Sequence, residues 1–307
     1  MMTSAWNAAT LSTASQLDVD SVLGVITDTG ALAGDFTTLF AVGDLLKITG
    51  LTDVANEGKY IYVTALTATT IDFQGKGFAD EVGDGDEILT KPEWMGIGQD
   101  QTSFHMEKNF LDLTDRTISY GGMLVDVMSM NFTYGELATG TFTFAGADYQ
   151  TPAVPITNAR VVDPADNAQP VNASSDVGMV IIDGIRTPFC IQSLGLELNN
   201  NNRAKECMGS LPPQGQTPGS SSVTVSMEAY LADENFQYMA NKVDSSPIEI
   251  LYFAENVDGG VAVHVKEAQL VFSDPASEGR DQDVTLSMEG VSRAPADGSS
   301  GLIIYWL

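Results

Sequence analysis

Basic residues are scarce in this sequence. The 307 residues include 14 Lys and Arg against 41 Asp and Glu, which gives a formal net charge of −27 at pH 7. Proteins that bind DNA or an anionic membrane do so mainly through Lys and Arg contacts. The charge therefore argues against a protein that grips phosphate groups, and it predicts that nucleic acid does not adhere to this surface.

Cysteine and long apolar runs are also rare. Only Cys190 and Cys207 occur, too few for a disulfide framework and without the paired spacing of a zinc site, so we expect two free thiols. No apolar run approaches the ~20 residues of a membrane span, and residues 1–15 lack the regions of a signal peptide. We expect no membrane insertion and a protein that stays in the compartment of its synthesis, or in something assembled there.

Recognisable catalytic motifs are missing too. His105 and His264 lie in strand-like runs without ligands at metal spacing, and no phosphate-binding loop, nucleophile elbow or dinucleotide fingerprint occurs. The acidic residues 80–87 form either a solvated turn or a calcium site without EF-hand order. A glycosidase-like use of the glutamates is a further alternative, but the Trp residues lie in expected termini and linkers. We predict no enzyme activity, no cofactor and no metal.

Alternation with a period of two dominates what is present. It is typical of β-strands with one buried and one solvated face. Helical spacing occurs at about 233–243, after the N-cap residue Asp233 and before Pro247. We therefore predict an all-β protein with one short helix. The strand-like segments of the larger part of the chain are 103–108, 117–134, 141–144, 193–199, 223–231, 247–254, 261–273 and 284–290.

A smaller block precedes these segments. Residues 21–92 are expected to form a compact β-barrel module. Residues 93–293 are expected to form an antiparallel β-sandwich, with a proline-containing long loop at 148–188. The strand-like runs of the module are 45–49, 59–67, 70–74 and 87–91, and Gly- and Asn-containing turns separate them.

The two ends of the chain are predicted to be extended arms, at residues 1–20 and 294–307. The C-terminal arm has a Gly- and Ser-containing linker and then six apolar residues, a composition typical of a docking segment. We expect this segment and the long loop to contact neighbouring subunits. The candidate contact residues are Leu302, Ile303, Ile304, Tyr305, Trp306, Leu307, Pro155 and Ile181.

Several short motifs occur in a fixed order. Residues 103–110 read S-F-H-M-E-K-N-F, residues 120–125 read Y-G-G-M-L-V, and residues 139–146 read T-G-T-F-T-F-A-G. An Asn-rich turn with Arg follows at 194–203, and G-R-D-Q-D-V lies at 279–284. This series resembles the tail tube, or major tail, proteins of long non-contractile-tailed bacteriophages, and the small block is similar to a module often embedded in them.

The resemblance implies a structural subunit of the virion tail. It implies hexameric rings that stack into a conduit around the tape measure protein, with tail terminator and baseplate proteins as further partners and assembly in the host cytoplasm. Double-stranded DNA would pass through during ejection without specific binding. A ring of six such chains would carry six times −27, or −162, so an acidic bore would repel phosphate over a Debye length of ~8 Å.

We predict that the polar strand faces with Glu197, Glu228 and Glu289, together with Asp126, include the lining of this bore. Ordinary outer-face or inter-ring carboxylates are the alternative reading of the same residues. A tail terminator, baseplate hub or gene transfer agent tube subunit would have the same fold. A carbohydrate-binding β-sandwich adhesin is an alternative from another class, and a calcium-dependent hydrolase is a third.

Overall fold

The computed structural model is built almost entirely from antiparallel β-strands, which confirms the predicted fold class. It describes residues 7–30, 35–98, 102–110, 112, 117–151, 169–186, 190–209, 213–231, 247–273, 275, 283–293 and 300–307. The helix predicted at 233–243 lies outside these residues. A short helix that the sequence pattern did not indicate, α1 (Phe36–Leu39), follows Asp35, whose side chain accepts the Thr37 N–H. Within the described residues, no helix is long and apolar enough to cross a membrane.

Seven strands form the small barrel, in the order β1-β7-β4-β5-β6-β3-β2. The N-terminal segment pairs with β7 through β1 and with β3 through β2, so one segment joins both borders of the sheet. The predicted N-terminal arm is therefore wrong in part, because it contains two barrel strands. The strands are β1 (Thr10–Leu11), β2 (Leu17–Asp20), β3 (Val25–Asp28), β4 (Leu45–Thr49), β5 (Tyr60–Leu66), β6 (Thr70–Gly75) and β7 (Ile88–Lys91).

The barrel encloses its own apolar core. Inward residues of β2 to β7 and the helix residue Phe36 form one buried cluster, which includes Leu17, Ile48 and Ile71. The strands β2, β6 and β7 alternate between buried and more exposed positions, as a sheet with one dry face requires. In β4 and β5, by contrast, consecutive positions are buried.

The sandwich has two layers that share one strand. The first layer is β11 (Thr139–Ala145), β10 (Thr117–Thr133), β15 (Ile191–Asn199), β18 (Ser222–Tyr230) and β21 (Thr285–Ser292). The second is β14 (Ile185–Arg186), β13 (Val177–Ile182), β19 (Ile248–Asn256), β22 (Leu302–Trp306) and β8 (Glu93–Gly96). The strand β20 (Gly259–Phe272) pairs with β19 and β22 in its first half and with β21 in its second.

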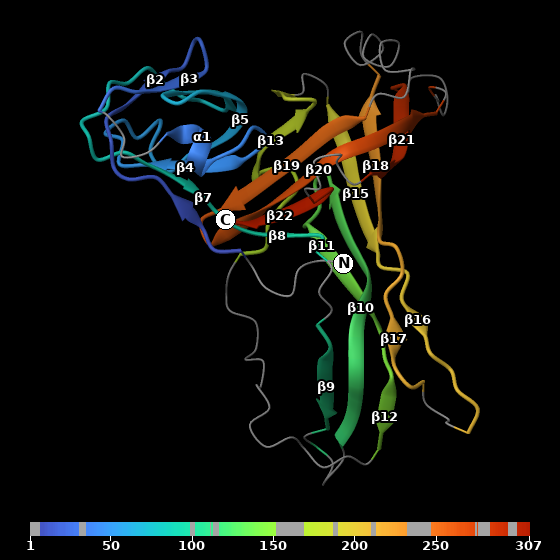
Figure 1. Ribbon diagram of the computed structural model, residues 1–307. Helices are drawn as coiled ribbons and strands as arrows, with labels where there is room; N and C mark the ends of the chain where they lie inside the picture. The colour runs from blue at the N-terminus through green and yellow to red at the C-terminus, as the bar shows by residue number, and fades with distance from the viewer. Residues whose placement is uncertain are drawn as a thin grey trace.

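The apolar faces of the two layers pack against each other. Leu196, Val225 and Met288 of the first layer and Ile250 and Ile304 of the second belong to one buried cluster. Figure 1 shows β19, β20 and β22 crossing over β15 and β18. The alternating leucines and valines predicted for β15 and β18 are buried, as expected for strands with one dry face.

The second layer is buried on both faces. Its other face carries Ile181, Phe253, Ile303 and Tyr305, which form a cluster with Leu45 and other residues of the barrel. This position explains why β19 and β22 contain continuous apolar runs rather than alternation. The barrel therefore covers the outer face of the sandwich's second layer.

Two ribbons extend from the sandwich away from the barrel (Figure 1). The first half of β10 pairs with β9 (Phe104–Asn109) and β12 (Asp148–Gln150). The second ribbon joins β16 (Arg203–Ala204) to β17 (Gln216–Thr217). The long loop predicted at 148–188 is wrong for β12, β13 and β14, which are strands, and its residues 152–168 lie outside the described chain.

Candidate functional site

The outward face of the first layer is a polar strand surface, and we call it the polar face. Its side chains come from alternate positions of β10, β15, β18 and β21, because the inward positions of the same strands fill the core. At the outward positions of these four strands there is no Lys or Arg. The polar face comprises Ser129, Asn131, Ser193, Gly195, Glu197, Thr224, Ser226, Glu228, Ser287 and Glu289.

Strand register brings the three predicted glutamates onto this one face. Glu228 lies opposite Ser287, and Ser226 lies opposite Glu289, so the two glutamates are diagonal neighbours on β18 and β21. Glu197 lies opposite Thr224, one strand further along the sheet. Glu197 and Glu289 are exposed and Glu228 is half-buried.

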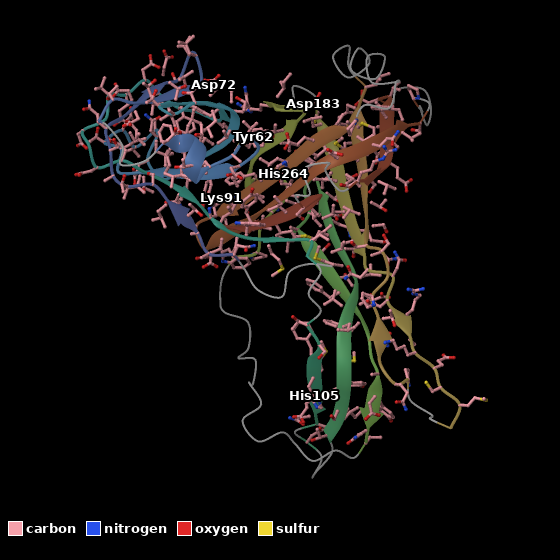
Figure 2. All side chains as sticks on the ribbon, viewed as in Figure 1. Tyr62, Asp72, Lys91, His105, Asp183 and His264 are labelled. Atoms are coloured by element: carbon pink, nitrogen blue, oxygen red, sulfur yellow. The ribbon has the colours of Figure 1, made fainter. Side chains whose placement is uncertain are left out.

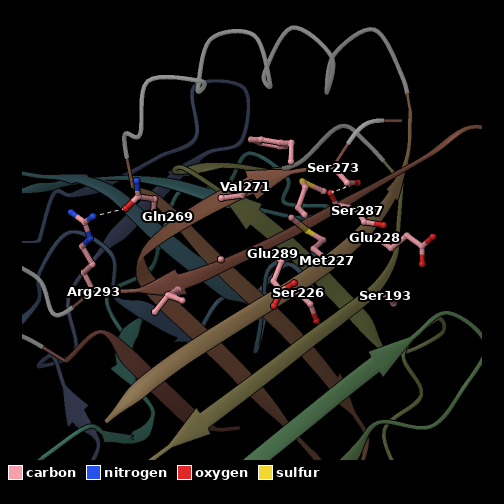
Figure 3. A pocket seen from close by; sticks show the side chains of 14 residues that line it. Ser193, Ser226, Met227, Glu228, Gln269, Val271, Ser273, Ser287, Glu289 and Arg293 are labelled. Carbon is pink, nitrogen blue, oxygen red and sulfur yellow. Dashed lines mark hydrogen bonds between the residues drawn. The ribbon is translucent and has the colours of Figure 1, made fainter. Parts of the chain in front are cut away.

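A shallow groove of about 850 Å³ crosses part of the polar face (Figure 3). Serines, the carboxylates of Glu228 and Glu289, and apolar side chains that include Val271 and Val291 line it. Arg293 also lines the groove, and its Nη2 donates to Gln269 Oε1 at 2.5 Å. Within the described chain, no three His, Cys, Asp or Glu residues are grouped closely enough to hold a metal ion. The groove therefore presents apolar groups together with small hydroxyls, two carboxylates and one guanidinium.

Close approach of neighbouring strands shapes this surface at Gly195. A Cβ at that position would lie 2.5 Å from Ser226 Oγ and 3.3 Å from Asn131 Oδ1. Because both neighbours are polar-face residues, the glycine lets their side chains converge above the sheet. The result is a surface of short side chains from which the glutamates project.

Asp126, the fourth predicted lining residue, holds a turn. Its main-chain carbonyl accepts the Asn200 N–H at 2.8 Å, and its Oδ1 accepts the Asn202 N–H at 2.9 Å. Asn200 and Asn202 in turn each donate to the Val125 carbonyl at 2.9 Å. This carboxylate thus fixes the Asn-rich turn after β15, and the structure gives it a different setting from the three glutamates.

The acidic residues 80–87 also hold turns of the barrel. Glu81 Oε1 accepts the N–H groups of Thr52 and Asp53 at 2.7 and 2.9 Å. Glu87, which is buried, accepts the N–H groups of Leu17, Asp84 and Gly85. Partial desolvation by itself raises the pKa of Glu81, but the hydrogen bonds from Thr52 and Asn56 outweigh it and lower the pKa. Because these carboxylates already accept hydrogen bonds from backbone N–H groups, the structure favours a turn at residues 80–87 over a calcium site.

The C-terminal residues differ from the prediction. Leu302, Ile303, Ile304 and Tyr305 are buried in β22, which pairs with β20 on one side and β8 on the other. The predicted docking arm is therefore wrong for these four residues, since they are core of their own chain. A strand buried on both faces has the same unbroken apolar pattern as an apolar tail, so sequence could not separate the two. The two remaining residues are Trp306, which is exposed, and Leu307, which packs at the edge of the core beside the barrel.

The two other predicted contact residues have different outcomes. Ile181 is fully buried between the second layer and the barrel, so it is not available to a neighbouring subunit. Pro155 lies outside the described residues. Cys190 and Cys207 are exposed free thiols, as predicted. His105 hydrogen-bonds Ser119 Oγ at 2.7 Å.

A buried polar cluster at the contact between barrel and sandwich was not predicted. Glu249 of β19 accepts a hydrogen bond from the Tyr62 hydroxyl of β5 and also bonds the ring of His264 of β20. Figure 2 shows Tyr62 and His264 at this contact, near Lys91, which pairs with Asp44 at 2.6 Å. The fully buried His264 lies between alanine and valines, and a lone histidine in such a run is the one signal that could have indicated it.

Burial and partners act in opposite directions on this cluster. Burial alone raises the pKa of Glu249, but the hydrogen bonds from His264 and Tyr62 and the nearby positive charge of Lys266 lower it overall. Burial and the Glu249 carboxylate raise the pKa of Tyr62. Glu249 is therefore a charged residue held by neutral and cationic partners, a structural link between the two domains.

Comparison with protein families gives a match over most of the chain. Residues 6–292 match the family described as "Phage tail tube protein". Comparison with curated protein sequences gives no match. The matched range spans both the barrel and the sandwich, including every strand of the polar face. The chain belongs to the phage tail tube protein family.

Proposed function

We propose that this chain forms hexameric rings that stack into the tail tube, and that the polar face lines the bore through which viral DNA passes during ejection. The observation that carries the proposal is the convergence of Glu197, Glu228 and Glu289 on one open strand face without Lys or Arg at its outward positions. A conduit for a polyanion needs a surface of this kind, because cationic side chains would bind phosphates and retard the strand.

The distance over which charges interact is comparable to the distance between DNA and the wall of a narrow bore. Repulsion between exposed charges acts over a Debye length of about 8 Å at physiological ionic strength. DNA that fills a narrow bore would lie within that distance of the wall at every ring. The short hydroxyl side chains between the glutamates leave few groups that could bind a base or a phosphate. DNA is therefore expected to slide without specific contacts.

The borders of the first layer support ring closure. Within the described residues, β11 pairs with β10 alone, and residues 268–272 of β20 pair on that layer with β21 alone. In the part of the chain that the structure describes, the first layer thus has two open sheet borders, which are sites for pairing with another chain. Joining one border to the other border of a neighbour, six times, would remove all of them in a closed barrel.

The remaining parts of the proposal concern partners and location. The tape measure protein would occupy the same bore before DNA does, and terminator and baseplate proteins would close the two ends of the tube. Assembly would take place in the host cytoplasm. These partners rest on membership of the tail tube family together with the open borders and the polar face.

Electron microscopy of the purified chain at rising concentration tests the assembly. Tubes with a central channel are expected. Single rings that do not stack would favour a tail terminator, and a persistent monomer would contradict the proposal.

The bore is tested with the triple variant Glu197→Gln, Glu228→Gln and Glu289→Gln in assembled tails. We expect intact tubes but slower DNA ejection, and the matched control Asp72→Asn, Asp86→Asn and Glu93→Gln, at exposed residues outside the polar face, should eject normally.

A further inference from the structure

Phe142 is an aromatic residue of the first layer with most of its side chain uncovered. It lies in β11 opposite Met128 of β10, and Met128 is 5% exposed and belongs to the core between the two layers. Side chains directly opposite each other on an antiparallel pair point to the same face of the sheet, so Phe142 points to the core side. Its exposed fraction is nevertheless 56%. An aromatic side chain on the core side of an open border is suited to burial against another molecule.

The other border of the same layer has apolar side chains on the same side. In the second half of β20, Phe272 lies opposite Met288 of β21, which is 3% exposed in the core. Leu270 is two residues before Phe272 on the same strand, so both side chains point to the core side. Both are half-buried and pack against the core cluster. The core side of this border therefore presents two apolar side chains that are each partly uncovered.

The directions of the strands suit a contact between these two borders. The path from β11 to β20 passes through β10, β15, β18 and β21, and every neighbouring pair on it is antiparallel. The strands β11 and β20 are five steps apart, so they run in opposite directions. Copies related by rotation about one axis keep the direction of each strand relative to that axis. The β20 border of one copy would therefore meet the β11 border of the next as an antiparallel pair.

The two borders are too far apart to meet within one chain. Five spacings of about 4.8 Å separate β11 from β20 along the sheet, roughly 24 Å in all. A second copy brings its β20 border with the matching strand direction and with apolar side chains on the matching side. A second copy of this chain is therefore the partner that fits the β11 border.

We propose that Phe142 of one copy inserts beside Leu270 and Phe272 of the next copy, so that neighbouring subunits share one apolar core at the ring contact. The inference rests on the proposed ring and names the side chains that make its contact specific. Backbone hydrogen bonds could join any two open sheet borders. A buried aromatic anchor adds binding energy at one place, and it thereby selects the partner border and its register.

Disulfide trapping tests the contact. The background chain carries Cys190→Ser and Cys207→Ser, which remove the two exposed thiols. Phe142→Cys is then combined with Leu270→Cys in one variant and with Phe272→Cys in another, so that each border carries one thiol. After assembly and mild oxidation, at least one of the two variants should give a series of covalent multimers that ends at six chains. Each ring contact would bring one pair of Cα atoms within the distance of about 7 Å that a disulfide allows.

A matched control separates this contact from random collisions. Val257 lies in the turn between β19 and β20 and is 90% exposed, outside both borders. The variant with Phe142→Cys and Val257→Cys in the same background should give no such series. Because β11 and β20 are roughly 24 Å apart along the sheet, a border-to-border disulfide can form only between chains.

Substitution of Phe142 tests the anchor without altering the monomer core. Phe142→Ser should raise the protein concentration needed for assembly about tenfold or more, because an apolar side chain is no longer buried at the contact. Phe142→Leu keeps an apolar side chain and should stay within about threefold of the original chain. Thermal unfolding of both monomers should match the original, since the residue is exposed.

The outcomes distinguish the shared core from the ring itself. Normal assembly of Phe142→Ser, or assembled rings that give no covalent series from either cysteine pair, would overturn the shared core. The ring proposal would then stand, because the borders could still pair through their backbones. Failure of the unaltered chain to form rings or tubes would overturn both.

Discussion

The barrel and the sandwich differ in how the border strands of their sheets are paired. In the barrel, the N-terminal segment pairs with β7 and β3 and joins the two borders within one chain. In the first layer of the sandwich, β11 and the second half of β20 leave two borders open among the described residues. Exposed sheet edges are normally protected in monomeric proteins. The barrel is therefore complete by itself, whereas the sandwich has the edges of a protein made to assemble.

Removing Leu302–Leu307 should produce the largest effect and test whether the two regions are independent. β22 contributes four buried side chains to two cores, and each such loss costs about 2–5 kcal/mol, so the sum exceeds the typical stability of a domain. We expect the sandwich to fail to fold while the barrel keeps its structure, as measured by NMR spectra of the shortened chain. Trp306→Ala, at an exposed residue of β22, should change the free energy of unfolding by less than about 1 kcal/mol.

Glu87→Ala should weaken the barrel alone. The variant leaves three backbone N–H groups without their acceptor in a buried site, and a cost of about 2–4 kcal/mol is expected for the barrel. Calorimetry should show a lower transition for the barrel and an unchanged one for the sandwich. Asp86→Asn, at the adjacent exposed position, should have almost no effect. Equal shifts of both transitions would contradict the independence of the two regions.

Acid should loosen the contact between the two regions through Glu249. The folded-state pKa of this group lies below its ordinary value of about 4.3, so its contribution to stability is complete above that pH and is lost as the pH falls through the folded pKa. Denaturant titrations between about pH 6 and pH 3 should show this loss. Glu249→Gln should be less stable at pH 6 and should vary less with pH. An unchanged pH profile in that variant would remove Glu249 from this role.

Lysines placed on the open border should affect assembly and leave the monomer nearly unchanged. Thr141→Lys with Thr143→Lys adds charge to the exposed β11, and lysine on an edge strand opposes pairing with another sheet. We expect a change in the free energy of unfolding of less than about 0.5 kcal/mol together with loss of tubes in electron micrographs. Thr69→Lys with Val54→Lys, at exposed barrel residues, should leave tubes intact. Tubes from the β11 variant would exclude this border from the ring contact.

The pattern of single strands could be predicted from the sequence because it is local. Every strand segment proposed for the barrel and for the sandwich corresponds to an observed strand, and the leucines of β15 are buried as the alternation requires. Phe142 is the instructive exception, since it lies on the apolar side of β11 yet is 56% exposed. Its strand is at the border of the first layer, and none of the strands that the structure describes in the second layer pairs with it.

The candidate site divides in the same way. The outward positions of Glu197, Glu228 and Glu289 follow from period-two alternation within each strand. Their placement on one common face depends on the registers of β15, β18 and β21, which pair residues far apart in the chain. Asp126 shows the limit of the method, because its hydrogen bonds to the Asn-rich turn could not be read from its position in a strand.

The sequence by itself determined the all-β class, the order of the strands, the acidic surface and the family, because these depend on local alternation, composition and motif order. The tertiary structure decided that the apolar C-terminus is a core strand, that the barrel covers the second layer, and that Tyr62, Glu249 and His264 meet. The physical reason is that the alternation of apolar and polar residues predicts which face of a strand is buried. Which element covers that face depends on pairing and packing between residues far apart in the sequence.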